Sequence, residues 1–166
     1  LFSVNSGHAT SAYTGAHFGA STILEALQNP IVKTKVESVL EEIRSLLIAK
    51  WGFDEQALVD YHKIILSRFE NPFIVDDIAR VARTPIRKLG YDERFIRPIR
   101  ELRERGLPYK NLLATVSYIF SYYDENDEQS VELQRLLQEK SLTEVVEQVT
   151  GLTDHDLIAE IVASIQ

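Results

Sequence analysis

Hydrophobic residues recur along most of the chain at intervals of three and four, the spacing that places them on one face of an α-helix. No segment alternates convincingly between apolar and polar residues, which is the pattern of a half-buried strand. The sequence therefore predicts an all-α, multi-helical globular domain. The clearest helical run covers residues 30–51, and its apolar positions are Val32, Val36, Val39, Leu40, Ile43, Leu46 and Leu47.

Helix caps and breaks divide this pattern into roughly nine or ten helices. Asn29-Pro30 can open the long helix and Asp54 can cap the one that follows it. Ser21 or Thr22 can cap the short helix that precedes them. The expected helical segments, with 84–88 as a single turn, are 1–19, 21–27, 30–51, 54–69, 75–82, 84–88, 94–105, 109–122, 130–140, 143–149 and 154–165.

The first of these segments is rich in small side chains. Gly7, Gly15 and Gly19 have no Cβ, so a neighbouring backbone or a ligand can approach them closely. We therefore expect residues 1–19 to form a tight, buried helix.

The composition is that of one soluble globular domain over residues 1–166, with 45% hydrophobic and 26% charged residues. The sequence has no cysteine, which excludes disulfides and thiolate metal sites and fits a cytoplasmic protein. No apolar run approaches the roughly 20 residues of a membrane span, so no membrane partner is expected. The chain starts at Leu1 and has no methionine, so we expect a segment upstream of it.

The net charge of −7 argues against a nucleic-acid partner, but charge is segregated along the chain. Residues 124–166 carry eleven acidic side chains and two basic ones, and we expect them to form a solvated acidic surface. Residues 80–105 are locally positive, because they include nine basic side chains and only four acidic ones. The basic residues are Arg80, Arg83, Arg87, Lys88, Arg94, Arg97, Arg100, Arg103 and Arg105.

Candidate chemistry is concentrated in residues 1–9. Asn5 and His8 lie three residues apart, so a helix presents their amide and imidazole on one face. Such a pair can hold a substrate oxygen and stabilise charge that develops on it. Spacing alone favours a simpler interpretation, in which Asn5 caps the backbone and His8 is a satisfied core histidine. No zinc site is expected, since the other histidines have no second ligand at metal spacing: His17, His62 and His155.

Five strings along the chain carry a resemblance to a known family. They are Leu1-Phe2-Ser3-Val4-Asn5-Ser6-Gly7-His8, Trp51-Gly52-Phe53-Asp54, Arg68-Phe69-Glu70-Asn71-Pro72, Arg83-Thr84-Pro85-Ile86-Arg87-Lys88-Leu89 and Gly106-Leu107-Pro108-Tyr109-Lys110-Asn111-Leu112. The first is similar to the signature Lys-Leu-Phe-x-x-Asn-x-Gly-His. Together they resemble the polyol-specific long-chain dehydrogenases, and most closely those that act on mannitol 1-phosphate.

The resemblance implies the fold of the 6-phosphogluconate dehydrogenase C-terminal-like type. It also implies an oxidoreductase that interconverts mannitol 1-phosphate and fructose 6-phosphate with NAD. In this family the cofactor is bound mainly by an N-terminal Rossmann domain, whose Gly-x-Gly-x-x-Gly turn is absent here. The implied partners are therefore a small polyol or sugar phosphate and the N-terminal Rossmann domain of the same protein.

Residue roles follow from the same resemblance. The lysine that serves as general base would immediately precede Leu1, so the chain alone is expected to be inactive. Asn5 would hydrogen-bond the reacting oxygen in an alkoxide-like transition state, and His8 would hold an adjacent hydroxyl.

A phosphorylated polyol also needs cations, and Arg83, Arg87 and Lys88 can provide them. The alternative is that these side chains solvate a surface or pair with the acidic last part of the chain. Arg68 and Asn71 are further candidates for substrate binding, unless they only close the end of a helix.

Two other functions stay open at this point. A mannitol 2-dehydrogenase or sugar-acid reductase domain would share the Asn5 and His8 positions. A non-enzymatic helical interaction module would instead use residues 80–105 to dock an acidic partner.

Overall fold

The computed structural model describes residues 2–166, and these form eleven helices and no β-strand. This confirms the predicted all-α class. The count exceeds nine or ten because residues 85–88, expected as a turn, are helical. The elements are α1 (Phe2–His17), α2 (Ile23–Gln28), α3 (Pro30–Trp51), α4 (Glu55–Phe69), α5 (Ile78–Val81), α6 (Pro85–Lys88), α7 (Ile96–Glu104), α8 (Lys110–Ser121), α9 (Glu128–Glu139), α10 (Leu142–Thr150) and α11 (His155–Ile165).

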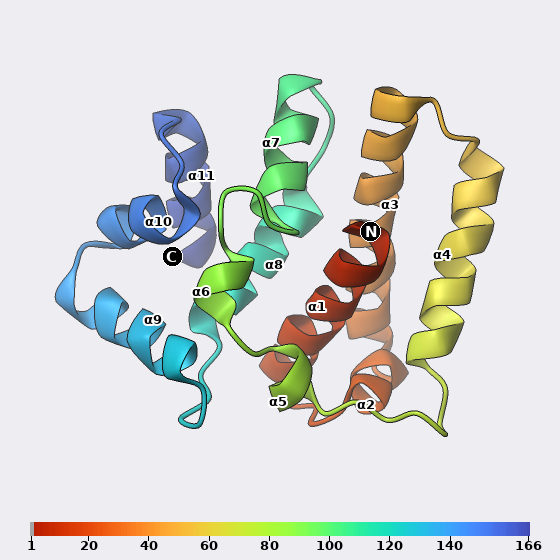
Figure 1. Ribbon diagram of the computed structural model, residues 1–166, viewed down its shortest axis with the longest axis horizontal. Coiled ribbons are helices and arrows are strands. Elements are labelled where there is room, and N and C mark those ends of the chain that lie inside the picture. Colours follow the sequence, from red (N-terminus) through yellow and green to blue (C-terminus); the bar gives the residue numbers. More distant parts are fainter. Residues whose placement is uncertain (1) are drawn as a thin grey trace.

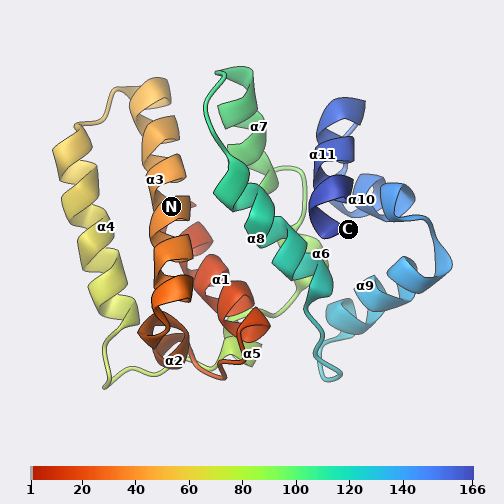
Figure 2. The same ribbon diagram turned by 180° about the vertical axis from the view of Figure 1, so that it is seen from behind.

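Helices α1, α3 and α8 form the centre of the molecule. Helix α1 packs against α2, α3, α4, α5 and α8, while α3 also packs against α7. Figures 1 and 2 both show α4 at one end, beyond α3, and the group α9–α11 at the other. Ten of the sixteen residues of α1 are buried, as expected for the tight helix predicted from its small side chains.

Two glycines bring α1 close to its neighbours. A Cβ added at Gly7 would lie 3.2 Å from Cδ2 of Leu40 on α3, and one added at Gly15 would lie 2.5 Å from Cβ of Ala26 on α2. The prediction for Gly19 is wrong, because nothing lies within 4 Å of its Cβ position. Its φ of +87° shows that Gly19 instead allows the left-handed turn that follows α1.

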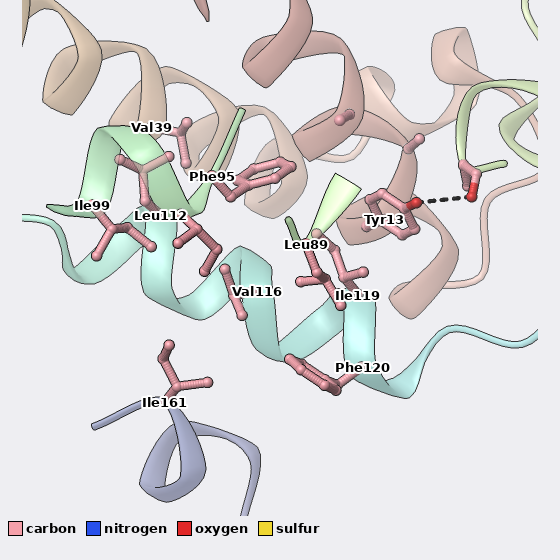
Figure 3. Close-up of a cluster of buried hydrophobic side chains, with 14 of the residues drawn as sticks. Tyr13, Val39, Leu89, Phe95, Ile99, Leu112, Val116, Ile119, Phe120 and Ile161 are labelled. Carbon is pink, nitrogen blue, oxygen red and sulfur yellow. Dashed lines mark hydrogen bonds between the residues drawn. The ribbon is translucent and has the colours of Figure 1, made fainter. Parts of the chain in front are cut away.

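The hydrophobic core is continuous from α2 and α3 through α1 and α8 to the group α9–α11. Figure 3 shows Leu112, Val116, Ile119 and Phe120 of α8 reaching toward α3, the segment 89–99 and Ile161 of α11. Tyr13 of α1 enters the same core, and its hydroxyl donates a hydrogen bond of 2.8 Å to the main-chain oxygen of Ala82. Because this bond satisfies the buried phenol, it fixes the segment that follows α5 against α1.

The predicted caps are confirmed, but α5 starts later than expected. The side chains of Thr22, Asn29 and Asp54 each accept a hydrogen bond from the first turn of the helix that follows. The segment before α5 is instead paired with the segment before α2. The N–H of Ile23 donates to the oxygen of Asp76 at 2.9 Å, and the N–H of Ile78 donates to the oxygen of Ser21 at 3.0 Å. This pairing holds residues 75–77 in an extended form.

A buried histidine ties α4 to α1 and α3. His62 is 2% exposed, its Nδ1 lies 2.9 Å from Nη1 of Arg44, and its Nε2 lies 2.8 Å from Oγ of Ser3. Because a guanidinium can only donate, Nδ1 must accept and the ring proton must be on Nε2, which donates to Ser3. The hydrogen bond between His62 and Ser3 therefore fixes the first turn of α1, where Ser3 lies two residues before Asn5.

We expect His62 to make the fold sensitive to acid. Burial, with a smaller effect from Arg44, lowers the pKa of His62 from 6.5 to about 4. Between these values the unfolded chain binds more protons than the folded one, so stability is full above pH 6.5 and falls as the pH drops toward 4. Denaturant unfolding should show that the wild type loses about 2 kcal/mol more over this range than His62→Gln. Equal pH profiles for the two proteins would contradict this expectation.

Residues 2–166 form no helix that is long and apolar enough to cross a membrane. Within the same range, no three side chains of His, Cys, Asp or Glu come together in a way that could hold a metal ion.

Candidate functional site

Helix α1 presents Asn5 and His8 to one cavity of about 420 Å³. The opposite wall comes from the segment around α5 and α6, which lies beside α1 in Figure 1. Of the described residues that line the cavity, five are cationic and none is acidic, so we call it the cation cavity. Its lining consists of Asn5, His8, Ala9, Arg80, Val81, Arg83, Thr84, Arg87, Lys88 and Arg94.

The imidazole of His8 is held between Phe69 and Asp76. The ring of Phe69 is stacked on it, with centroids 4.8 Å apart and planes inclined by 16°. Nε2 lies 3.3 Å from Oδ2 of Asp76. Burial lowers the pKa of His8 although Asp76 opposes the effect, so the ring is neutral at neutral pH. Because a carboxylate can only accept, the ring proton is on Nε2 and Nδ1 is an acceptor.

The position of Asp76 depends on the pairing between the segments that precede α2 and α5. Its main-chain oxygen accepts from Ile23, while its carboxylate pairs with both His8 and Arg80. A residue distant in sequence from His8 thereby orients the imidazole.

Lys88 lies inside the wall of the cation cavity. Its Nζ donates to the main-chain oxygens of Val81, at 2.6 Å, and of Arg83. Burial lowers the pKa of Lys88 to about 8, and the charges of Arg94 and Arg87 add to the effect. The ammonium therefore holds the connection between α5 and α6 together as well as lining the cavity.

The start of α6 is held by the N-terminus of α9. Thr84 has a φ of +55°, which is unusual for a β-branched residue. Its N–H donates to Oδ2 of Asp127 at 2.8 Å, and the N–H of Arg87 donates to Oε1 of Gln129 at 2.9 Å. These two acceptors come from the acidic last part of the chain, and they fix the backbone from which Arg83 and Arg87 project.

The side chains of Arg83 and Arg87 are exposed at the rim of the cavity. Within residues 2–166 neither forms an ion pair with a carboxylate. The pairing of the basic segment with the acidic last part, which the sequence left open, occurs instead at Arg103. Its guanidinium pairs with Asp154, at 3.4 Å, and with Glu160.

Arg68 and Asn71 do not line the cation cavity. Arg68 is exposed in the last turn of α4, and the side-chain oxygen of Asn71 accepts from the N–H of Phe73 at 2.9 Å. In this string it is Phe69, between them, that contacts His8. A role for Arg68 and Asn71 in substrate binding stays a prediction.

Four residues of the site were not among the sequence candidates: Phe69, Asp76, Arg80 and Arg94. Phe69 and Asp76 carry no signal of their own, because only the pairing of distant segments brings them to His8. Arg80 and Arg94 belong to the basic segment 80–105, but spacing alone does not separate them from the six other arginines and the lysine around them.

A second cavity of about 400 Å³ adjoins the cation cavity. The two share Asn5 and Arg94, so these residues stand at the boundary between them. The second cavity has a different character, since it mixes acidic, basic and aromatic side chains. Its other lining residues are Phe2, Leu46, Leu47, Lys50, Trp51, Asp92, Glu93, Arg97 and Glu101.

The fold and the site thus define a helical domain that presents an amide, an imidazole and a group of cations to one cavity. The sequence matches the family described as mannitol dehydrogenase C-terminal domain over residues 1–166. The chain belongs to this family, which confirms the resemblance seen in its motifs.

Curated relatives match almost the whole of this chain. A mannitol-1-phosphate 5-dehydrogenase of Streptococcus pneumoniae is 70% identical over 162 residues, covering 98% of this chain and 43% of the relative. The enzyme of the same name from Streptococcus mutans serotype c is 70% identical over 166 residues, covering 100% and 44%. The chain therefore spans less than half the length of these relatives.

Solved structures support the fold. The ternary complex of Pseudomonas fluorescens mannitol 2-dehydrogenase with NAD and D-mannitol has a TM-score of 0.72 at 21% identity, over 98% of this chain and 35% of the other. A substrate-free D-sorbitol dehydrogenase has a TM-score of 0.74 at 16% identity, over 96% and 36%. At these identities the likeness establishes the helical fold alone.

Proposed function

We propose that this chain is the substrate-binding domain of an NAD-dependent enzyme that interconverts mannitol 1-phosphate and fructose 6-phosphate. The observation that carries the proposal is the cation cavity, in which Asn5 and His8 face five cationic side chains. An amide and a neutral imidazole suit the hydroxyls of a polyol, and the cations suit a phosphate ester. The 70% identity to mannitol-1-phosphate 5-dehydrogenases supports the same substrate.

Asn5 and His8 bind different oxygen atoms of the polyol. The amide of Asn5 forms no hydrogen bond within residues 2–166, so its donor is available for the oxygen of the reacting alcohol. Nδ1 of His8 can accept a hydrogen bond from an adjacent hydroxyl, with Asp76 and Phe69 fixing the ring. The remaining requirement is a base for the alcohol proton, which we assign to a lysine directly before Leu1.

NAD, when bound, accepts the hydride of the alcohol. Residues 2–166 contain no strand followed by a glycine-rich turn, so they do not provide a site for its pyrophosphate. We therefore assign the cofactor to an N-terminal Rossmann domain of the same protein.

The phosphate assignment is tested by comparing mannitol 1-phosphate with mannitol in the full-length protein. With Arg83, Arg87 and Lys88 all changed to alanine, the KM for mannitol 1-phosphate is expected to rise at least tenfold, because charge-assisted hydrogen bonds to the phosphate are lost. Initial rates of NADH formation measure this. The KM for mannitol should change little.

Lys88 needs a separate control, since its amine also holds two main-chain oxygens. The double variant Arg83→Gln/Arg87→Gln leaves those bonds intact and should reproduce most of the effect. A wild type without preference for the phosphate ester would contradict the proposal and favour a mannitol 2-dehydrogenase or sugar-acid reductase. Full turnover by a variant lacking both Asn5 and His8 would favour an interaction module instead.

A further inference from the structure

Arg94 is the least exposed arginine of the cation cavity. Its main-chain oxygen accepts a hydrogen bond of 2.7 Å from Oγ of Ser6, which lies between Asn5 and His8 on α1. Its side chain is 18% exposed, whereas Arg83 and Arg87 stand at the rim. The residue is therefore anchored directly beside the two candidate catalytic side chains.

The donors of Arg94 are largely unused. Its Nε is buried without a hydrogen-bond partner among the described residues. Its only close carboxylate is Glu93, at 3.6 Å from Nη2, which is beyond hydrogen-bonding distance. Because Nε is out of contact with water and has no acceptor, this partly buried guanidinium is incompletely compensated for its desolvation, and an anionic ligand would supply the missing acceptors.

The other cations of the cavity are already engaged. Arg80 pairs with Asp76, and Lys88 donates to two main-chain oxygens. Nε of Arg83 donates to the main-chain oxygen of Arg80 at 3.0 Å. Arg87 is exposed, so water competes with any ligand for its charge. Of the five, Arg94 combines burial with free donors.

We propose that Arg94 is the residue that selects a phosphorylated polyol, by binding the phosphate oxygens with its guanidinium where the cation cavity meets the second cavity. Arg83 and Arg87 then add charge-assisted hydrogen bonds to the same phosphate from the rim. This inference rests on the proposed function, because it requires the substrate to be a phosphate ester.

The test compares Arg94→Gln and Arg94→Lys with the wild type in the full-length protein. For mannitol 1-phosphate, Arg94→Gln should raise the KM by about 10- to 100-fold, since a charge-assisted hydrogen bond in a partly buried site is lost. The KM for mannitol and for NAD should stay within about twofold. Inorganic phosphate should compete with mannitol 1-phosphate in the wild type and lose this effect in Arg94→Gln.

Arg94→Lys is the control for a folding defect, because it keeps the positive charge at this position but not the paired N–H donors of a guanidinium. It should give a smaller rise in KM with an unchanged thermal midpoint. Arg105→Gln is the matched control, since Arg105 is on the same segment and outside both cavities. It should behave like the wild type.

Each other outcome overturns the assignment of Arg94. An equal rise for mannitol and mannitol 1-phosphate would show that Arg94 holds the polyol chain or the shape of the site. A rise confined to the KM for NAD would show that Arg94 contacts the cofactor instead of the phosphate of the substrate. A preference for the phosphate ester that survives Arg94→Gln would refute this inference and leave the proposed function standing, whereas a wild type without that preference would refute both.

Discussion

Replacing Asn5 with alanine in the full-length protein is expected to lower kcat by about 100- to 1000-fold, with little change in KM. In the proposed function the amide donates to an oxygen that gains negative charge as hydride leaves, so its hydrogen bond would be stronger in the transition state than in the bound substrate. Losing such a donor therefore affects the chemical step more than binding. Steady-state rates with mannitol 1-phosphate and NAD measure the effect.

Asn5→Asp provides a control of the same shape. A carboxylate cannot donate and repels a developing alkoxide, so the loss should be at least as large as with alanine. Asn126→Ala, at an exposed position between α8 and α9, should leave turnover unchanged. A proportional rise in KM with constant kcat would show that Asn5 only binds the substrate.

Replacing Glu42 with alanine is expected to reduce the free energy of unfolding by about 3 kcal/mol. Glu42 is 6% exposed on α3, yet it caps the N-terminus of α8, where Tyr109 provides no side-chain cap. Its carboxylate accepts from the N–H of Asn111 at 2.9 Å, from the N–H of Leu112 at 2.8 Å and from the amide of Asn111 at 2.9 Å. Alanine would leave these donors, at the positive end of a helix, without an acceptor.

Thermal and denaturant unfolding would measure this loss, with a drop in Tm of roughly 10 °C for a domain of this size. Glu42→Gln keeps one acceptor oxygen and should cost about 1 kcal/mol. Glu41→Ala removes the same side chain from the adjacent, exposed position and should have almost no effect. Equal stability of the Glu41 and Glu42 variants would refute the capping role.

The sequence by itself determined the helical class, most helix boundaries and the family. These depend on local rules: apolar residues at intervals of three and four, and caps such as Thr22, Asn29 and Asp54 that bond within one turn of their own helix. The location of Asn5 and His8 on one helix face was predictable for the same reason, since residues three positions apart in a helix point in similar directions.

Only the tertiary structure decided what surrounds these two residues. Phe69 and Asp76 reach His8 because α4 packs on α1 and because the segments before α2 and α5 pair, and neither event has a short-range signature. Glu42 caps α8 across 69 residues of sequence, and its neighbour Glu41 looks identical in the sequence. Burial depends on how distant segments pack, and it separates Arg94 from Arg83 and Arg87, the exposed arginines of the same cavity.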